Sequence, residues 1–272
     1  MHAKGAAEPP KLEIPGVKYV IAVGSGKGGV GKTTVAVNLA ISLNELGHRV
    51  GLMDADVYGP NVPLMMGLHE QPYSKGNRII PLELNALKLI SMGFLNPGDK
   101  PLVWRGPMLH SVIQQFLRGV EWGELDYLVI DLPPGTGDVV LSLVQSTPLT
   151  GAIVVTTPSD VSLEDARKAV NMFRQVRVEI LGIVENMSYL IAPQSKERID
   201  VFGSGGGKRT AEQMNATFLG ELPLDPAIRI GGDSGKPVAW GGDERFLELA
   251  RRVVERAGAV GAHSGPSISI EE

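Results

Sequence analysis

Residues 24–34 read GSGKGGVGKTT and directly follow the apolar run YVIAV at residues 19–23. An apolar strand, a glycine-rich loop, Lys-Thr and then a helical pattern form the context in which a phosphate-binding P-loop occurs. Glycines allow consecutive backbone N–H groups to converge on phosphate oxygens without a clash from Cβ atoms. The N-terminus of the following helix adds partial positive charge at the same place. The stretch therefore predicts a binding loop for the phosphates of a nucleotide.

The side chains after the glycines have separate roles in such a loop. Lys32 supplies a mobile cation for the β- and γ-phosphates, and the hydroxyl of Thr33 is a ligand for Mg²⁺. The predicted phosphate-binding residues are Gly26, Lys27, Gly28, Gly29, Val30, Gly31, Lys32, Thr33 and Thr34. Lys27 requires its own explanation, because a P-loop needs only the lysine beside its last glycine.

Apolar runs alternate with helical patterns along the chain. Short runs rich in Val and Ile predict buried strands at 19–23, 50–54, 87–91, 127–131, 152–157 and 180–186. Helical spacing or helix-start signals predict helices at 32–46, 107–118, 138–146, 160–177, 207–215 and 242–257. This alternation predicts an α/β protein with the three-layer P-loop NTPase fold, a mostly parallel sheet with helices on both faces.

Composition and charge limit the classes of function and the domain organisation. Residues 1–16 and 258–272 are rich in small residues and proline, which predicts flexible tails around one P-loop ATPase domain at 17–257. A net charge of −4 argues against nucleic-acid binding, and no apolar run is long enough to cross a bilayer. The N-terminal residues resemble neither a signal nor a transit peptide, so we expect a cytoplasmic protein. Cysteine is absent, which excludes disulfides and thiolate catalysis.

Acidic residues follow two of the predicted strands. Asp131 ends the run YLVID, at the position where a Walker B aspartate holds Mg²⁺. Asp54 and Asp56 lie in MDADVYGPN, at the end of another predicted strand. Two carboxylates with this spacing can both reach a metal or water site, although either one alone is also compatible with a turn or capping aspartate.

Lys27, the first of the two lysines in the loop, makes the motif resemble that of a known group of ATPases. GKGGVGKTT with Lys27 is similar to the deviant Walker A motif of the MinD, ParA and nitrogenase iron-protein group. This resemblance implies that Lys27 reaches across a homodimer interface to phosphates held by the other protomer. The chain also resembles, over roughly residues 17–257, one branch of this group, the Mrp/ApbC iron–sulfur cluster carrier ATPases. The segments that carry this narrower resemblance, in the same order along the chain, are 53–67, 104–117, 126–138, 156–170, 182–190 and 222–238.

The resemblance to Mrp/ApbC implies slow ATP hydrolysis between two protomers and transfer of a 4Fe–4S cluster to apo iron–sulfur proteins. It implies that Lys27, Lys32 and Asp56 are catalytic, with Asp56 orienting the attacking water. The metal side of the site would consist of Thr33, Asp56 and Asp131, around Mg²⁺. Asn186 would bind the adenine edge, and Pro223 and Asp225 would line the base pocket.

One segment departs from the family pattern. After NMSYL the family typically has Cys-Pro-x-Cys, whereas this chain has Ala192-Pro193-Gln194-Ser195. Neither a methyl group nor a neutral hydroxyl replaces a thiolate ligand of an iron–sulfur cluster. Three interpretations stay open: engineered replacement of the cysteines, a natural paralogue that lost the cluster, or a cluster held by carboxylates or histidines. The alternative function is a ParA- or MinD-like nucleotide switch that recruits a partner without carrying a cluster.

Overall fold

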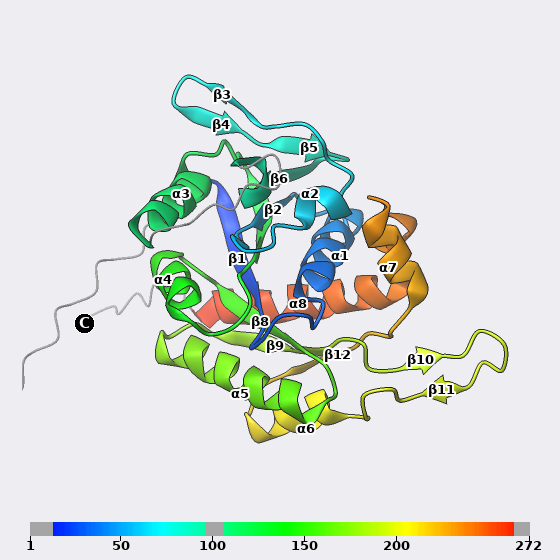
Figure 1. Cartoon of the computed structure of the whole chain (residues 1–272). Helices are drawn as coiled ribbons and strands as arrows, with labels where there is room; N and C mark the ends of the chain where they lie inside the picture. Colours follow the sequence, from blue (N-terminus) through cyan, green and yellow to red (C-terminus); the bar gives the residue numbers. More distant parts are fainter. Residues whose placement is uncertain (1–12, 96–105, 264–272) are drawn as a thin grey trace, which may run out of the picture.

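The computed structural model describes residues 13–95 and 106–263, which form one layered α/β structure (Figure 1). Its main sheet has the strand order β12-β9-β8-β1-β7-β2-β6-β5. Neighbouring strands are parallel except β5, which is antiparallel to β6. The strands are β1 (Val17–Gly24), β2 (Val50–Asp54), β5 (Leu82–Leu84), β6 (Leu87–Ser91), β7 (Leu125–Asp131), β8 (Gly151–Thr156), β9 (Ile180–Glu185) and β12 (Phe218–Glu221).

Helices cover both faces of this sheet (Figure 1). They are α1 (Lys32–Glu45), α2 (Val62–Met65), α3 (Gly106–Arg118), α4 (Asp138–Ser146), α5 (Asp160–Gln175), α6 (Gly206–Gln213), α7 (Pro226–Asp233) and α8 (Glu244–His263), with 3-10 turns at Met92–Leu95 and Val238–Gly241. One hydrophobic cluster joins the sheet to α3, α4, α5 and α6, and a second joins it to α1, α2, α7 and α8. The fold class predicted from the sequence is therefore confirmed.

Strand β1 shows why apolar and polar residues do not alternate along the predicted strands. Val20 and Ala22 belong to the hydrophobic cluster on one face, and Ile21 and Val23 belong to the cluster on the other. Because successive side chains of a strand point to opposite faces, a strand covered on both faces has to be apolar at every position. β1 lies between β8 and β7, so its carboxyl end, where the glycine-rich loop begins, is in the middle of the sheet edge.

Several elements were not predicted from the sequence. β5, β12, α2 and α7 are absent from the predicted set, as are two small hairpins, β3 (Tyr73–Lys75) with β4 (Arg78–Ile80) and β10 (Leu190–Ile191) with β11 (Arg198–Ile199). These strands have two to four residues, too few for a hydrophobic period to be recognised.

The expected tail boundaries differ from the structure. Helix α8 continues to His263, past the predicted domain end at residue 257, and its Gly261 lies against Tyr19. Ile14, inside the predicted N-terminal tail, is buried in the core. The remainder of both predicted tails, at 1–12 and 264–272, is outside the described residues. Within residues 13–95 and 106–263, no helix has the length and apolar composition needed to cross a membrane.

Candidate functional site

The glycine-rich loop connects β1 to α1 at the carboxyl edge of the sheet. Gly29 and Gly31 have φ angles of 81° and 79°, in the left-handed region that favours glycine. A Cβ atom on Gly26 would lie 2.0 Å from the backbone oxygen of Asp165 in α5. Backbone conformation at two positions and lack of space at the third therefore require glycine here.

Below the loop, Lys32 joins the residues predicted to hold the metal. Its Nζ lies 2.7 Å from Oδ1 of Asp131 and 3.5 Å from Oδ2 of Asp56. The Thr33 hydroxyl donates a hydrogen bond of 2.7 Å to Oδ2 of Asp131. Lys32 and Thr33 begin α1, Asp131 ends β7, and Asp56 follows the end of β2. These four side chains meet because the neighbouring parallel strands β2 and β7 end at the same edge of the sheet.

The buried aspartates have unusual proton affinities. Burial raises the pKa of Asp54 to about 8, and the negative charge of Asp131 adds to that rise. Burial also raises the pKa of Asp131, while the charge and hydrogen bond of Lys32 and the hydrogen bond of Thr33 oppose the rise. Lys32 is thus the buried cation that compensates the carboxylate of Asp131.

Asp54 and Asp56 do not share one environment, although the sequence allowed both to reach a metal or water site. Asp56 lines the cavity over the glycine-rich loop. Asp54 is fully buried, and its oxygens accept hydrogen bonds from the Asp56 N–H, the Val62 N–H and the Ser91 hydroxyl. Of these two aspartates, only Asp56 lines the cavity in which a metal ion or water would bind.

A cavity of about 310 Å³ lies over the loop. Its lining comprises Ser25, Lys27, Gly28, Gly29, Gly31, Lys32, Thr33, Thr34, Asp56, Asn61, Leu64, Met65, Pro134, Gly232 and Asp233. The wall formed by α2 and the end of α7 was missed from the sequence, because neither element was predicted. Lys27 is half-buried in this lining, and its ammonium has no hydrogen bond or ion pair within residues 13–95 and 106–263.

The three residues predicted to contact the base lie outside the lining of the cavity. Asn186 is buried and its Nδ2 donates to the backbone oxygen of Val30, which ties β9 to the glycine-rich loop. Pro223 is buried in the segment before α7, and Asp225 caps α7 through the N–H of Ala227. Asn186, Pro223 and Asp225 are not among the residues that line the cavity, so their contacts with a base stay a prediction.

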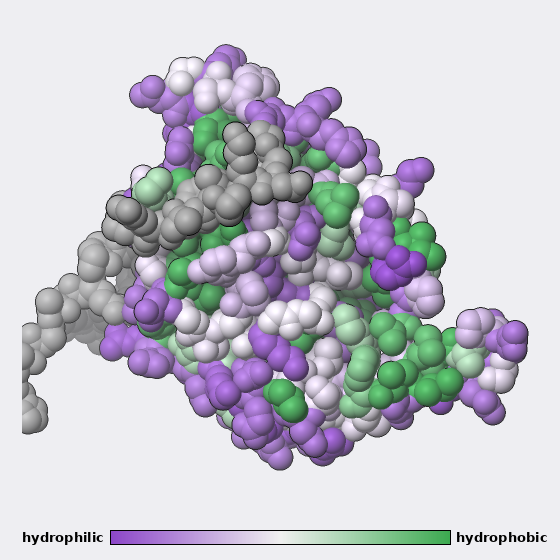
Figure 2. Space-filling model, in the orientation of Figure 1, coloured by the Kyte–Doolittle hydropathy of each residue, from purple (hydrophilic) through white to green (hydrophobic). Residues whose placement is uncertain are grey.

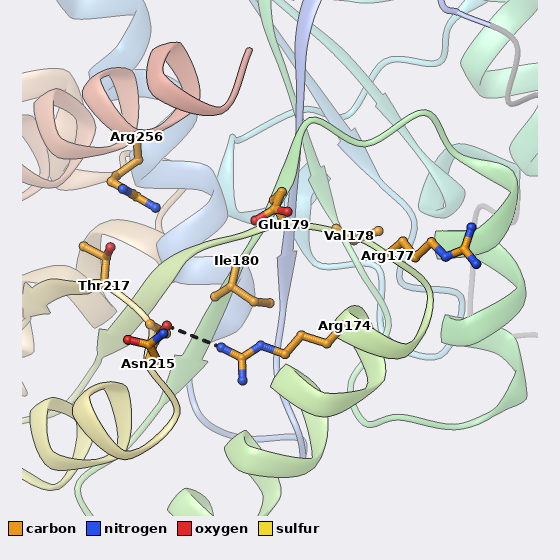
Figure 3. Close-up of a pocket in the computed structure, with 9 residues that line it drawn as sticks. Arg174, Arg177, Val178, Glu179, Ile180, Asn215, Thr217 and Arg256 are labelled. Carbon is orange, nitrogen blue, oxygen red and sulfur yellow. Dashed lines mark hydrogen bonds between the residues drawn. The ribbon is translucent and has the colours of Figure 1, made fainter. Parts of the chain in front are cut away.

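A larger cavity, of about 560 Å³, lies near the start of β9 and contains three arginines (Figure 3). Arg174 donates to the backbone oxygens of Met214 and Asn215, and Arg256 donates to that of Leu181. Figure 3 shows the side chain of Arg177 pointing away from the other two arginines. These cations have backbone partners or diverge, so this cavity is a weaker candidate than the convergent site over the loop.

Gly31 provides a test of how tightly the loop is packed. A Cβ atom there would lie 2.2 Å from Nδ2 of Asn186, whereas a Cβ atom on Gly29 would meet nothing within 4 Å. Gly29→Ala is expected to cost about 1–2 kcal/mol of stability from the left-handed backbone alone. Gly31→Ala adds the clash and should cost at least about 1 kcal/mol more, since it displaces a buried side chain. Equal losses for the two variants in urea unfolding without nucleotide would contradict the clash.

The segment that replaces the family's cysteines lies in the turn of hairpin β10–β11. Ser195 donates to the carboxylate of Glu197, and Ala192 offers only a methyl group and its backbone. Across the part of the chain that the structure describes, no three His, Cys, Asp or Glu side chains are grouped so that they could hold a metal ion. The residues of this hairpin therefore do not fit an iron–sulfur cluster, and within residues 13–95 and 106–263 no histidine or carboxylate set replaces the thiolates.

The comparisons with known proteins agree with the geometry of this site. Over residues 16–256 the chain matches a ParA sequence family described as NUBPL iron-transfer P-loop NTPase. It is 53% identical over 253 residues to a Deinococcus radiodurans protein named iron-sulfur cluster carrier protein, covering 92% of this chain and 71% of that protein.

Two solved structures show similar folds. A nucleotide-binding protein from Archaeoglobus fulgidus in complex with ADP has a TM-score of 0.74 and 36% identity, covering 82% of this chain and 89% of that one. The Pyrococcus furiosus cell division ATPase MinD has a TM-score of 0.65 and 24% identity, covering 87% and 98%, which shows the shared fold alone. The glycine-rich loop, its acidic partners and the match over nearly the whole described chain place this protein in the NUBPL iron-transfer P-loop NTPase family.

Proposed function

We propose that this chain binds Mg·ATP in the cavity over the glycine-rich loop and hydrolyses it slowly as a homodimer. Through this ATPase activity it takes part in the family's delivery of iron–sulfur clusters to apoproteins, although Ala192 and Ser195 leave it without the thiolate ligands that would hold a cluster on the chain itself. The observation that supports ATP chemistry most strongly is the convergence of Lys32, Thr33, Asp56 and Asp131 below the loop. The ADP complex of the Archaeoglobus fulgidus relative is consistent with this ligand class. The cytoplasmic location expected from the sequence is part of the same proposal.

Different residues of the site bind the nucleotide and orient the attacking water. Backbone N–H groups of the loop and the Lys32 ammonium bind the β- and γ-phosphates, which requires Lys32 to turn from Asp131 toward the ligand. Asp56 orients the water whose oxygen attacks the γ-phosphorus while the bond to the bridging oxygen breaks. Thr33, Asp56 and Asp131 provide the oxygen ligands that suit Mg²⁺, which when bound neutralises charge on the phosphates.

Lys27 supports the dimeric part of the proposal. Its ammonium lines the cavity without a partner in the described chain, so it is free to contact phosphates. A cation that reaches phosphates bound by a second copy stabilises the transition state as an arginine finger does. Gel filtration with ATP, ADP and a non-hydrolysable analogue tests this dimer, and phosphate release from Mg·ATP tests hydrolysis. A chain that stays monomeric with ATP, or releases no phosphate, would refute the corresponding part.

A second candidate function is a nucleotide switch that recruits a partner and carries no cluster. The specific observation in its favour is the pair Ala192 and Ser195 at the positions of the family's cysteines. The hairpin also has an apolar surface behind its polar tip (Figure 2). It consists of Ile191, Ile199, Val201 and Phe202, which are 43–46% exposed. Binding of DNA, lipid or a protein that depends on ATP would distinguish this function from cluster delivery.

Introducing cysteines at the two positions where the family has them tests whether the hairpin turn alone decides cluster binding. After anaerobic reconstitution with iron and sulfide, the parent chain is expected to stay colourless, because it has no thiolate ligands. The double variant Ala192→Cys with Ser195→Cys should gain charge-transfer absorbance, with iron and sulfide shared between two protomers. A dark parent chain would show that other residues hold a cluster, and a colourless double variant would show that the hairpin is not shaped for one.

A further inference from the structure

One buried acidic side chain, that of Asp54, fixes both ends of the loop that carries Asp56. Oδ1 of Asp54 accepts a hydrogen bond of 3.1 Å from the N–H of Asp56, and Oδ2 accepts one of 3.2 Å from the N–H of Val62. Oδ2 also accepts a hydrogen bond of 2.8 Å from the hydroxyl of Ser91, its register partner in β6. Both ends of the loop are therefore hydrogen-bonded to the Asp54 side chain, which is itself hydrogen-bonded to Ser91 of the neighbouring strand β6.

The bond to Val62 has a particular structural role. Val62 is the first residue of α2, where backbone N–H groups have no partner inside the helix. The preceding residue, Asn61, makes no side-chain capping bond, so Asp54 supplies the acceptor instead. Because Leu64 and Met65 of α2 form a wall of the cavity, the position of this wall depends on Asp54 as well.

The middle of the loop lacks comparable attachment. Tyr58, between the two attached ends, is 72% exposed. Asp56 itself accepts hydrogen bonds from the N–H groups of Tyr58 and Gly59 through Oδ1, which leaves Oδ2 directed at Lys32. The direction of the Asp56 carboxylate is therefore set by a local turn whose starting point is held by Asp54.

We infer that Asp54 is a positioning residue, which holds the Asp56 turn and the start of α2 in the geometry needed for water attack on ATP. This inference rests on the proposed ATP hydrolysis. Asp54 does not act on the metal or the phosphates, since it is fully buried outside the cavity lining and its oxygens already accept three hydrogen bonds. Its contribution is made through Asp56, so it affects the chemical step more than nucleotide binding.

The test is Asp54→Asn, which preserves size but replaces one accepting oxygen with an NH₂ group. The Asn cannot accept from all three donors, so at least one end of the loop is released. A shift of about 1 Å in a reacting group costs up to about 100-fold in rate. We expect kcat for Mg·ATP to fall about 10- to 100-fold while KM changes less than about threefold.

Two control variants separate positioning from general damage. Asp126→Asn removes a carboxylate that pairs with Arg49 at the opposite end of β7, and it should leave kcat within about twofold. Ser91→Ala removes one donor and leaves Asp54 able to hold Asp56 and Val62, so its effect on kcat should be smaller than that of Asp54→Asn.

Amide hydrogen exchange gives a readout that does not depend on hydrolysis. The N–H groups of Asp56 and Val62 should be protected in the parent chain, and at least one should lose protection in Asp54→Asn. Unchanged protection of both, or an unchanged kcat per folded molecule, would overturn the inference. A parent chain that binds ATP without hydrolysing it would refute the proposed function, and the exchange of these two amides would then decide the positioning role alone.

Discussion

Replacing Lys32 with methionine is expected to weaken Mg·ATP binding by at least about 100-fold, because a hydrogen-bonded cation on the phosphates contributes about 3 kcal/mol. Methionine retains most of the length of the side chain and removes only its charge and donors. Isothermal titration calorimetry with a non-hydrolysable analogue measures this loss directly. Binding within threefold of the parent chain would show that the nucleotide does not use the glycine-rich loop.

The same substitution should destabilise the protein in the absence of nucleotide and Mg²⁺. Lys32 is the buried cation beside the fully buried Asp131, and removing one partner of a buried pair costs about 3–5 kcal/mol. Protonation of Asp131 limits this cost, since moving a carboxyl with an ordinary pKa near 4 to its neutral form at pH 7 takes about 4 kcal/mol. Urea unfolding in EDTA at pH 7 should therefore show a loss of about 3–4 kcal/mol.

The pH dependence of that loss has a definite sign. Burial raises the pKa of Asp131 in the folded chain, and Lys32 opposes the rise. Without Lys32 the folded-state pKa lies further above the unfolded value. Stability is then fully retained below the unfolded pKa and falls as the pH rises toward the folded pKa. The difference between the parent chain and Lys32→Met should thus be largest near pH 7–8 and shrink toward pH 5.

A double variant distinguishes the buried charge from general damage to the loop. Asp131→Asn combined with Lys32→Met removes both charges and leaves an oxygen that can accept the hydrogen bond of Thr33. It should recover part of the stability lost in the single variant and remove the pH dependence that Asp131 contributes, while ATP binding stays weak. A double variant as unstable as Lys32→Met at pH 7 would contradict the role given to Asp131.

The sequence predicted the parts of this site that depend on local order. A P-loop is a continuous segment whose glycines and Lys-Thr end follow directly from its chemistry, so the prediction that residues 26–34 bind phosphate needs no knowledge of tertiary contacts. Asp131 could be placed because the carboxyl ends of neighbouring parallel strands meet at one edge of the sheet. The strand pairing confirms this, with Asp131 beside both Val23 of β1 and Asp54 of β2.

Features that depend on packing between distant segments could not be predicted. Asp54 and Asp56 are only two residues apart in the sequence. Their different roles become visible only when Ser91 of β6 and Val62 of α2 are seen to donate hydrogen bonds to Asp54. The wall formed by α2 and α7 depends on short elements with no hydrophobic period, such as the four residues of α2. The contact of Asn186 with Val30 joins residues 156 positions apart.

Replacing Lys27 with alanine is expected to reduce ATP hydrolysis about 1,000-fold, the lower end of the effect of an arginine finger, while stability and nucleotide binding change little. The Lys27 ammonium has no hydrogen bond or ion pair in the described chain, so its removal leaves no buried charge uncompensated. Phosphate release at saturating Mg·ATP measures the rate, and thermal unfolding checks the fold. Turnover within twofold of the parent chain would remove the argument for a second lysine in the reaction.

Mixing two inactive variants tests whether Lys27 acts on its own nucleotide or on that of a second copy. Lys27→Ala binds ATP but lacks the early lysine, whereas the Lys32→Met, Asp131→Asn variant retains Lys27 and binds ATP poorly. In a mixed dimer, the nucleotide held by the first variant can receive Lys27 from the second. An equimolar mixture in which half of the dimers are mixed, each with one working site of two, should recover about a quarter of the parent activity. No recovery in a mixture that forms mixed dimers would place the action of Lys27 within one protomer, because only a lysine that crosses the interface can complement in this way.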